Sequence, residues 1–191
     1  MLTIEDTEIK EVKLLIPDYY QDNRGGFFEA YNQERFLEAR LQTQWVQDNV
    51  SVSRQGVIRG LHFQQGPHAQ TKLIWVASGE ILDVAIDLRP GSSTFRNYMM
   101  RVLSAENHFQ LYIPKGFAHG FQVLSSEAVV CYKCDAAYHA ASEKTLLWSD
   151  PSLGIPWKAH LDPIISVRDA NGVSLLALIR QDASDGQGAT S

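Results

Sequence analysis

The sequence lacks several features that would point to a membrane, to export or to nucleic acid. No hydrophobic stretch approaches the roughly 18 apolar residues of a membrane span, and residues 1–10 have neither the basic start nor the apolar core of a signal peptide. There is no long run of charges of one sign, and the formal net charge is −5. We therefore expect a soluble cytoplasmic protein with no membrane or nucleic-acid partner, although local basic residues could still bind a phosphate.

Cysteine is also scarce, with only Cys131 and Cys134, which form the motif C-Y-K-C. A structural zinc site would need a second pair of ligands, and a redox pair is expected near the start of a helix. Residues 128–135 instead have the composition of a strand, in which alternate side chains point to opposite faces. These cysteines are therefore interpreted as ordinary thiols.

Short strands separated by turn signals account for most of the 191 residues. This length suits a single domain over 1–191, and a hydrophobic content of 45% is enough to build a core. Many short strands at near-regular spacing favour an all-β sandwich or barrel. Helices are expected at 33–41 and 173–180, and a frayed tail at 181–191. The expected strands are 9–16, 27–31, 45–53, 57–64, 71–77, 80–88, 98–103, 110–113, 118–124 and 128–134.

The expected strand at 80–88 has two different faces. One face is aliphatic, with Leu82, Val84 and Ile86, and should lie in the core or in an interface. The other face carries Asp83 and Asp87. The alternation leaves open whether Asp83 is solvated or lines a pocket.

Two stretches, 47–64 and 110–122, each place a histidine beside glycines, with Arg, Lys, Gln and Asn nearby. This mixture suits a pocket that binds an anion and moves protons. His62, in G-L-H-F-Q, is either a structural strand residue or a general base. Arg59 could bind a phosphate through two parallel hydrogen bonds. Strict alternation would put Arg59 and His62 on opposite faces, but a bulge at Gly60 would bring both into one pocket.

Four motifs occur in this order along the chain: R-G-L-H, Q-T-K-L, P-K-G-F-A-H-G-F and Y-K-C. Glu143 and W-S-D-P follow them. Together they resemble the dTDP-4-dehydrorhamnose 3,5-epimerase family, and the resemblance runs from about Asp22 to Asp169. The resemblance implies a cupin-like jelly roll with a few short helices. It also implies inversion of C3 and C5 of dTDP-4-dehydro-6-deoxy-D-glucose to give dTDP-4-dehydro-L-rhamnose. No metal and no other cofactor are expected.

The resemblance also implies a division of chemical roles. His62, oriented by Asp169, removes a proton next to the C4 ketone. Lys72 holds the negative charge that develops on O4, and Asp83 could pair with Lys72 and keep it charged. Tyr132 delivers a proton to the opposite face. Taken alone, Lys72 would be a solvated strand-end lysine and Tyr132 a core tyrosine.

By the same resemblance, the segment D-N-R-G-G-F-F-E crosses to a neighbouring subunit of a homodimer with shared active sites. There Arg24 meets the diphosphate, while Phe27 and Glu29 approach the base; the alternative is an ordinary turn with a packed phenylalanine. The aliphatic face of 80–88 is a further surface that a dimer could cover. The remaining expected ligand contacts are Gln47 and Asn49 to nucleotide and sugar, His119 to the sugar, Tyr138 stacked on thymine, and Glu143 and Arg168, the latter standing where the family commonly has lysine.

Three alternatives remain open from the sequence. An epimerase that acts at only C3 or only C5 would use the same base and acid. A metal-dependent cupin would need an H-x-H pair, yet Phe63 and Gln64 follow His62. A catalytically silent sugar-binding module would have no need for His62, Lys72, Asp169 and Tyr132 together.

Overall fold

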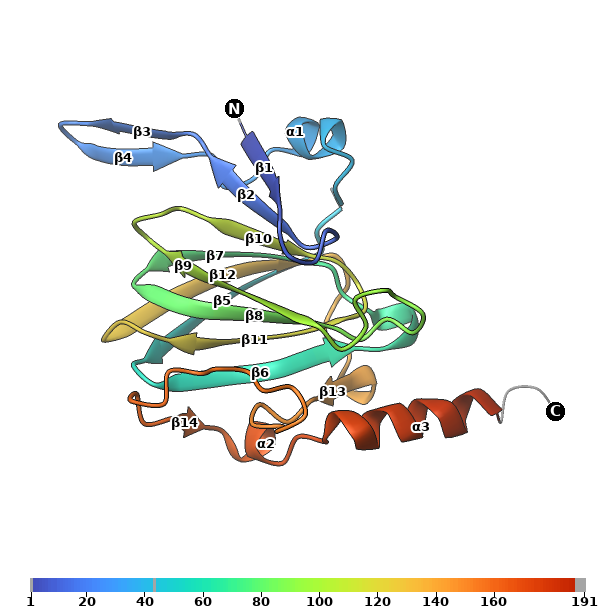
Figure 1. Cartoon of the computed structure of the whole chain (residues 1–191). Coiled ribbons are helices and arrows are strands. Elements are labelled where there is room, and N and C mark those ends of the chain that lie inside the picture. Colours follow the sequence, from blue (N-terminus) through green and yellow to red (C-terminus); the bar gives the residue numbers. More distant parts are fainter. Residues whose placement is uncertain (1, 43, 188–191) are drawn as a thin grey trace.

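The computed structural model describes residues 2–42 and 44–187. Two six-stranded sheets face each other (Figure 1). The first sheet has the order β1 (Leu2–Asp6), β2 (Lys13–Pro17), β10 (Gln110–Ile113), β7 (Lys72–Ser78), β12 (Glu127–Cys134) and β5 (Gln47–Arg54). The second has the order β13 (Glu143–Thr145), β6 (Val57–Gln64), β11 (Phe117–Val123), β8 (Glu80–Asp87) and β9 (Tyr98–Ser104), and β14 (Ile164–Ile165) pairs with β6.

The other elements are short and lie outside the two sheets. A hairpin of β3 (Tyr19–Asp22) and β4 (Gly25–Phe28) projects from the first sheet (Figure 1). The α-helices are α1 (Gln33–Glu38), α2 (Val167–Ala170) and α3 (Leu175–Gln187), and the 3-10 turns are η1 (Gly66–His68) and η2 (Ala140–Ser142). The expectation of a mostly β protein with a few short helices is confirmed.

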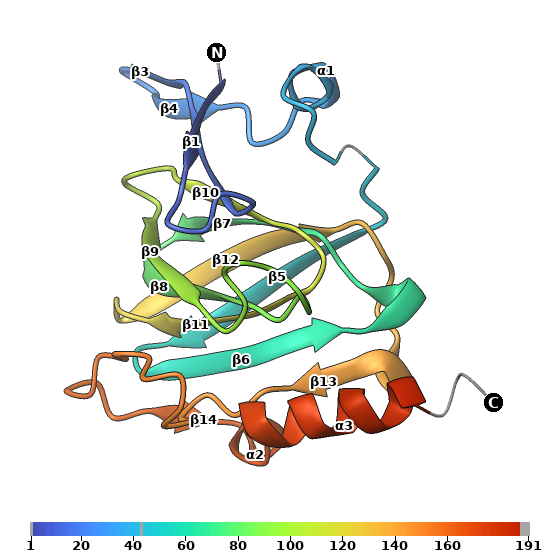
Figure 2. The ribbon, with the colours of Figure 1, turned by 45° about the vertical axis from the view of Figure 1, so that its right-hand side comes forward.

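The main core lies between the sheets and follows from period-2 alternation along the strands. Ile74 and Val76 of β7 point inward from the first sheet and meet Phe121 and Val123 of β11 from the second. On the opposite side of the second sheet, Val84 and Ile86 pack against Leu146, Leu153, Leu175 and Leu178. Figure 2 shows α3 lying below this sheet. The aliphatic face of β8 is therefore covered by the chain's own C-terminal part, and it does not call for a partner subunit.

Most expected strands are confirmed to within about two residues, and those at 57–64 and 110–113 coincide with β6 and β10. The expected strand at 9–16 begins later, at Lys13. Its first part is a turn in which the Thr7 hydroxyl accepts from the Ile9 N–H and donates to the Ile9 and Val12 carbonyls. Strands β1, β3, β13 and β14, of two to five residues each, were not expected.

The helices also differ in extent from the expectation. α1 begins after Asn32, whose side chain caps the Glu34 and Arg35 N–H groups, and it ends at Glu38 rather than at residue 41. α3 continues to Gln187, through most of the segment that was expected to fray. Gln and Ala after Arg180 are adequate helix formers, and no proline interrupts them. Residues 188–191 of that expected tail lie outside the described residues.

Candidate active site

A bulge in β6 brings the side chains of Arg59 and His62 into one cavity. His62 pairs with His119 and Arg59 with Phe121, so two residues of β6 oppose the single Gly120 of β11. Gly60 has φ +118°, and a Cβ there would lie 2.7 Å from both Gly120 Cα and the His119 carbonyl oxygen. Only glycine fits this close approach. The expected bulge at Gly60 is confirmed, and Arg59 and His62 both line the cavity.

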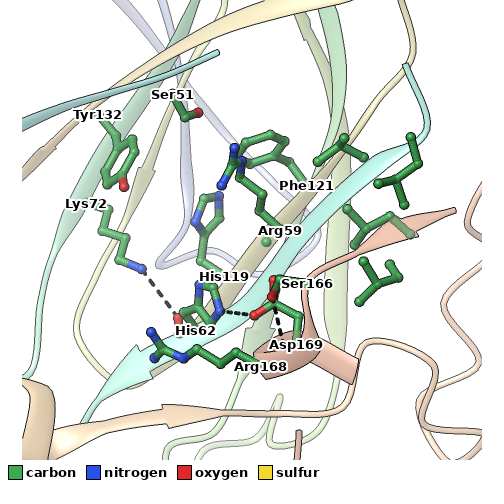
Figure 3. A pocket seen from close by; sticks show the side chains of 15 residues that line it. Ser51, Arg59, His62, Lys72, His119, Phe121, Tyr132, Ser166, Arg168 and Asp169 are labelled. Carbon is green, nitrogen blue, oxygen red and sulfur yellow. Dashed lines mark hydrogen bonds and ion pairs between the residues drawn. The ribbon is translucent and has the colours of Figure 1, made fainter. Parts of the chain in front are cut away.

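The cavity has a volume of about 500 Å³ and is lined by both sheets (Figure 3). A smaller space of about 90 Å³ shares His62, Lys72 and Tyr132 with it and is therefore adjacent. Eleven of the site residues expected from the sequence line these two spaces: Arg59, His62, Lys72, His119, Tyr132, Arg168 and Asp169 in the larger, and Gln47, Asn49, Tyr138 and Glu143 in the smaller.

His62 and Asp169 form a hydrogen-bonded pair although 107 positions separate them. His62 Nε2 lies 2.7 Å from Asp169 Oδ1, and Asp169 Oδ2 accepts from the Gly60 N–H at 3.3 Å. Ser166 caps α2 by accepting from the Asp169 N–H at 3.0 Å. Burial raises the pKa of Asp169, but the bonds from His62 and Gly60 outweigh it, and the net pKa is lowered. The ionised carboxylate accepts a hydrogen bond from Nε2–H of His62, which leaves Nδ1 with a lone pair.

Lys72 lies on β7, across the cavity from β6, and is buried. Its Nζ donates to the His62 carbonyl oxygen at 3.3 Å (Figure 3). Burial lowers the pKa of Lys72, against the opposing effects of Cys134, Asp83 and Glu143. A desolvated ammonium beside the His62 backbone suits a group that stabilises an oxyanion.

Asp83 differs from its expected role. It is fully buried, lines neither space, and is bonded through Oδ2 to His119 Nε2 at 2.8 Å rather than ion-paired with Lys72. Because β8 lies beside β11 in the second sheet, the Asp83 carboxylate lies next to His119, on the same face of that sheet. A direct contact of Asp83 with a ligand is therefore not supported.

Tyr132 comes from β12 of the first sheet, whereas His62 comes from β6 of the second. Burial raises the pKa of Tyr132, so its phenol is protonated at neutral pH. A proton donor and a proton acceptor thus occupy opposite walls of one cavity.

Arg59 and the residues near Tyr138 supply the polar contacts around these groups. Arg59 donates to the Ser53 hydroxyl at 2.9 Å and has no ion-paired carboxylate among the residues that the structure describes. Its charge is therefore available to an anion. At the edge of the smaller space, Arg168 pairs with Glu143, and the Tyr138 N–H donates to Gln47 Oε1 at 2.8 Å.

Arg24, Phe27 and Glu29 do not reach the cavity of their own chain. The side chains of Arg24 and Phe27 are 86% and 67% exposed on the hairpin, and Glu29 pairs with Arg35 at 2.9 Å. None of the three lines either space around His62.

Some lining residues were missed from the sequence although a signal existed. Ser51 continues the alternation of Gln47 and Asn49 along β5, and Phe121 follows His119 at a spacing of two. Ser166 stands three residues before Asp169, which is the spacing of a helix N-cap.

Two further features concern metals and membranes. Within residues 2–42 and 44–187, no group of three or more His, Cys, Asp or Glu side chains is placed to share a metal ion. In the same part of the chain, no helix combines the length and apolar character that crossing a membrane requires.

Comparison with known proteins gives a consistent result. The model of the family described as dTDP-4-dehydrorhamnose 3,5-epimerase matches residues 6–176. An enzyme of that name from Shigella flexneri is 46% identical over 172 residues, which cover 90% of this chain and 94% of the relative. A relative of the same name from Neisseria gonorrhoeae is 44% identical over 171 residues, or 90% of this chain, but the chain spans only 52% of its length.

Solved structures agree with these matches. A dTDP-6-deoxy-D-glucose-3,5-epimerase from Legionella pneumophila, in complex with dTDP-4-keto-L-rhamnose, superposes with a TM-score of 0.89 at 43% identity, covering 95% of this chain and 96% of that one. A 3'-monoepimerase from Streptomyces bikiniensis, in complex with dTDP-quinovose, gives a TM-score of 0.88 at 30% identity, covering 97% and 98%.

Proposed function

The chain belongs to the dTDP-4-dehydrorhamnose 3,5-epimerase family and has that family's activity, and on this premise we propose how its residues divide the reaction. The substrate is dTDP-4-dehydro-6-deoxy-D-glucose, and inversion at C3 and C5 gives dTDP-4-dehydro-L-rhamnose. Both carbons flank the C4 ketone, so one group that stabilises an enolate can serve both. The cytoplasmic location expected from the sequence stays a prediction.

His62 Nδ1 removes the proton next to the ketone, because Asp169 occupies Nε2 and holds the ring. The resulting enolate carries its charge on O4, where the Lys72 ammonium stabilises it. Tyr132 then protonates the carbon from the other side. The main support for this proposal is that His62 and Tyr132 line one cavity from opposite sheets. A base alone would return the proton to the face of the sugar from which it came.

The nucleotide occupies the rest of the site. Arg59 binds the diphosphate, since its guanidinium lines the cavity without a carboxylate partner among the described residues. His119 contacts the sugar. Gln47, Asn49, Glu143 and Arg168 contact sugar or nucleotide at the smaller space, and the exposed ring of Tyr138 stacks on thymine.

Deuterium uptake at C3 and C5 in D₂O, followed by NMR together with product stereochemistry, tests this reaction. The unmodified enzyme should incorporate deuterium at both carbons. Tyr132→Phe should still exchange substrate protons through His62 but form little inverted product. Tyr112→Phe is the matched control, because Tyr112 is also half-buried but lines neither space.

Each outcome has a clear meaning. Uptake at only one carbon would replace the double epimerase by a single epimerase. Unchanged inversion in Tyr132→Phe would remove Tyr132 as the acid while the epimerase activity stands.

We further propose a homodimer in which the β3–β4 hairpin completes the partner's nucleotide site. The hairpin extends away from the two sheets in Figures 1 and 2, and its Tyr20 and Phe27 are 59% and 67% exposed. Val50 and Val52 add exposed apolar side chains on the outer face of β5. In the partner's site, Arg24 would meet the diphosphate, and Phe27 and Glu29 would approach the base.

Light scattering at assay concentration measures the oligomeric state. Subunit mixing tests the shared site: Arg24→Ala and His62→Ala subunits, each with low activity alone, should regain activity when mixed, because one site of each mixed dimer is intact. A fully active monomer, or mixing without recovery, would contradict a shared site.

A further inference from the structure

A second carboxylate–imidazole pair lies beside the catalytic pair. His119 and His62 are directly opposite each other on β11 and β6, and both line the cavity (Figure 3). Just as His62 Nε2 is bonded to Asp169, His119 Nε2 lies 2.8 Å from Asp83 Oδ2. In the reaction proposed for this site, Asp83 has no role of its own.

The geometry fixes the proton on His119. A carboxylate only accepts hydrogen bonds, so Nε2 of His119 carries the proton and Nδ1 is left for a ligand. Asp83 is fully buried, and its second oxygen, Oδ1, has no hydrogen-bond partner. A buried oxygen without a partner requires an explanation, because it usually costs stability.

The charge of Asp83 also favours the charged form of Lys72, although no hydrogen bond or ion pair joins these two described side chains. Asp83, Glu143 and Cys134 act on the Lys72 ammonium, and Tyr132 and the His62 carbonyl are also near it. The Glu143 carboxylate is already paired with Arg168. Burial raises the pKa of Cys134 to about 11, so its thiol is neutral at physiological pH.

We infer that Asp83 is a positioning residue that fixes His119 as the Nε2–H tautomer and so leaves its Nδ1 lone pair for the substrate. This inference rests on the proposed function, since it concerns a group that meets the substrate. Asp83 acts through His119 and touches no ligand itself.

The variant Asp83→Asn tests the inference, and Asp87→Asn is its matched control. Asp87 lies on the same face of β8 and is equally buried, but it binds Arg89, Ser92 and Thr94 in the following loop. In Asp83→Asn, kcat should fall by about 10- to 100-fold, as is typical for loss of an orienting partner, while KM changes little. The alkaline fall of kcat should also begin at a lower pH, because removing the negative charge lowers the pKa of Lys72 further.

Asp87→Asn should lose stability and keep the wild-type pH profile. A wild-type kcat and pH profile in Asp83→Asn would overturn the inference, and so would the same change in both variants. ¹⁵N-labelled histidine NMR of the unmodified protein gives a second test that needs no folded variant. Nε2–H on His119 supports the inference and Nδ1–H overturns it, even if the wild-type protein fails to turn over the dTDP-4-keto sugar and the proposed function falls.

Discussion

Asp169→Asn should separate the orientation of the base from its presence. The carboxylate has two oxygens, which accept from His62 Nε2 at 2.7 Å and from the Gly60 N–H at 3.3 Å. An amide has one oxygen for these two donors, so one of them loses its acceptor. In this buried place, the loss should lower the free energy of unfolding by about 1–3 kcal/mol.

The effect of Asp169→Asn on turnover depends on whether the amide oxygen accepts from His62 or from the Gly60 N–H. If the amide oxygen faces Gly60, its NH₂ group faces His62 and the imidazole proton moves to Nδ1. No lone pair then faces the substrate. If the oxygen faces His62, the base survives but loses its orienting charge. Averaged over both arrangements, we expect kcat to fall on the order of 10²-fold.

Steady-state kinetics and urea unfolding together check this prediction. Asp150→Asn is the control, because Asp150 is also buried and accepts from backbone N–H groups, at Leu175 and Ser152, but lies outside the site. It should lose stability without a comparable loss of kcat. Wild-type turnover in Asp169→Asn, or an equal kcat loss in Asp150→Asn, would refute the role of Asp169 in orienting the base.

The pH dependence of the stability difference provides a further check. The folded-state pKa of Asp169 is lowered, so its ionised form contributes stability above the unfolded-state pKa, and this contribution is lost as pH falls through the folded-state pKa. The gap in unfolding free energy between wild type and Asp169→Asn should therefore be largest near neutral pH and shrink in acid. A gap that stayed constant down to low pH would contradict the lowered pKa.

Three further predictions concern the base, the bulge and metals. His62→Ala should reduce turnover on the order of 10²–10⁴-fold while far-UV circular dichroism stays that of the wild type; near-normal turnover would mean that another residue is the base. Gly60→Ala should lower the free energy of unfolding by about 3 kcal/mol, because a strained φ and a 2.7 Å backbone contact add together. Gly66 has φ +63° but open space around it, so Gly66→Ala should lower that free energy by only about 1–2 kcal/mol. Dialysis against a strong chelator should leave activity unchanged, and a loss restored by one metal would favour the metal-dependent cupin.

The sequence determined much of the fold through patterns that act locally. Alternation and turn residues located β6 and β10 to the residue and most other strands closely, because one face of each strand is buried and turn residues such as glycine and proline follow many of the strands. The same reasoning anticipated the bulge at Gly60, since Arg59 and His62 could share a pocket only if the alternation broke between them. The short strands β1, β3, β13 and β14 were not found from the sequence. β13 and β14 pair with the longer strand β6, whereas β1 and β3 pair with β2 and β4, which have the same lengths as they do.

Only the tertiary structure decided which charged groups meet. The pairing of His62 with Asp169 follows from α2 packing beside β6, a contact between segments more than a hundred residues apart that local propensity cannot encode. Alternation left Asp83 undecided between solvent and pocket. The neighbouring strand β11 gave it His119 as a partner and left Lys72 without an ion pair among the described residues. A side chain's partner is set by sheet order and register, and these emerge only when the whole core is packed.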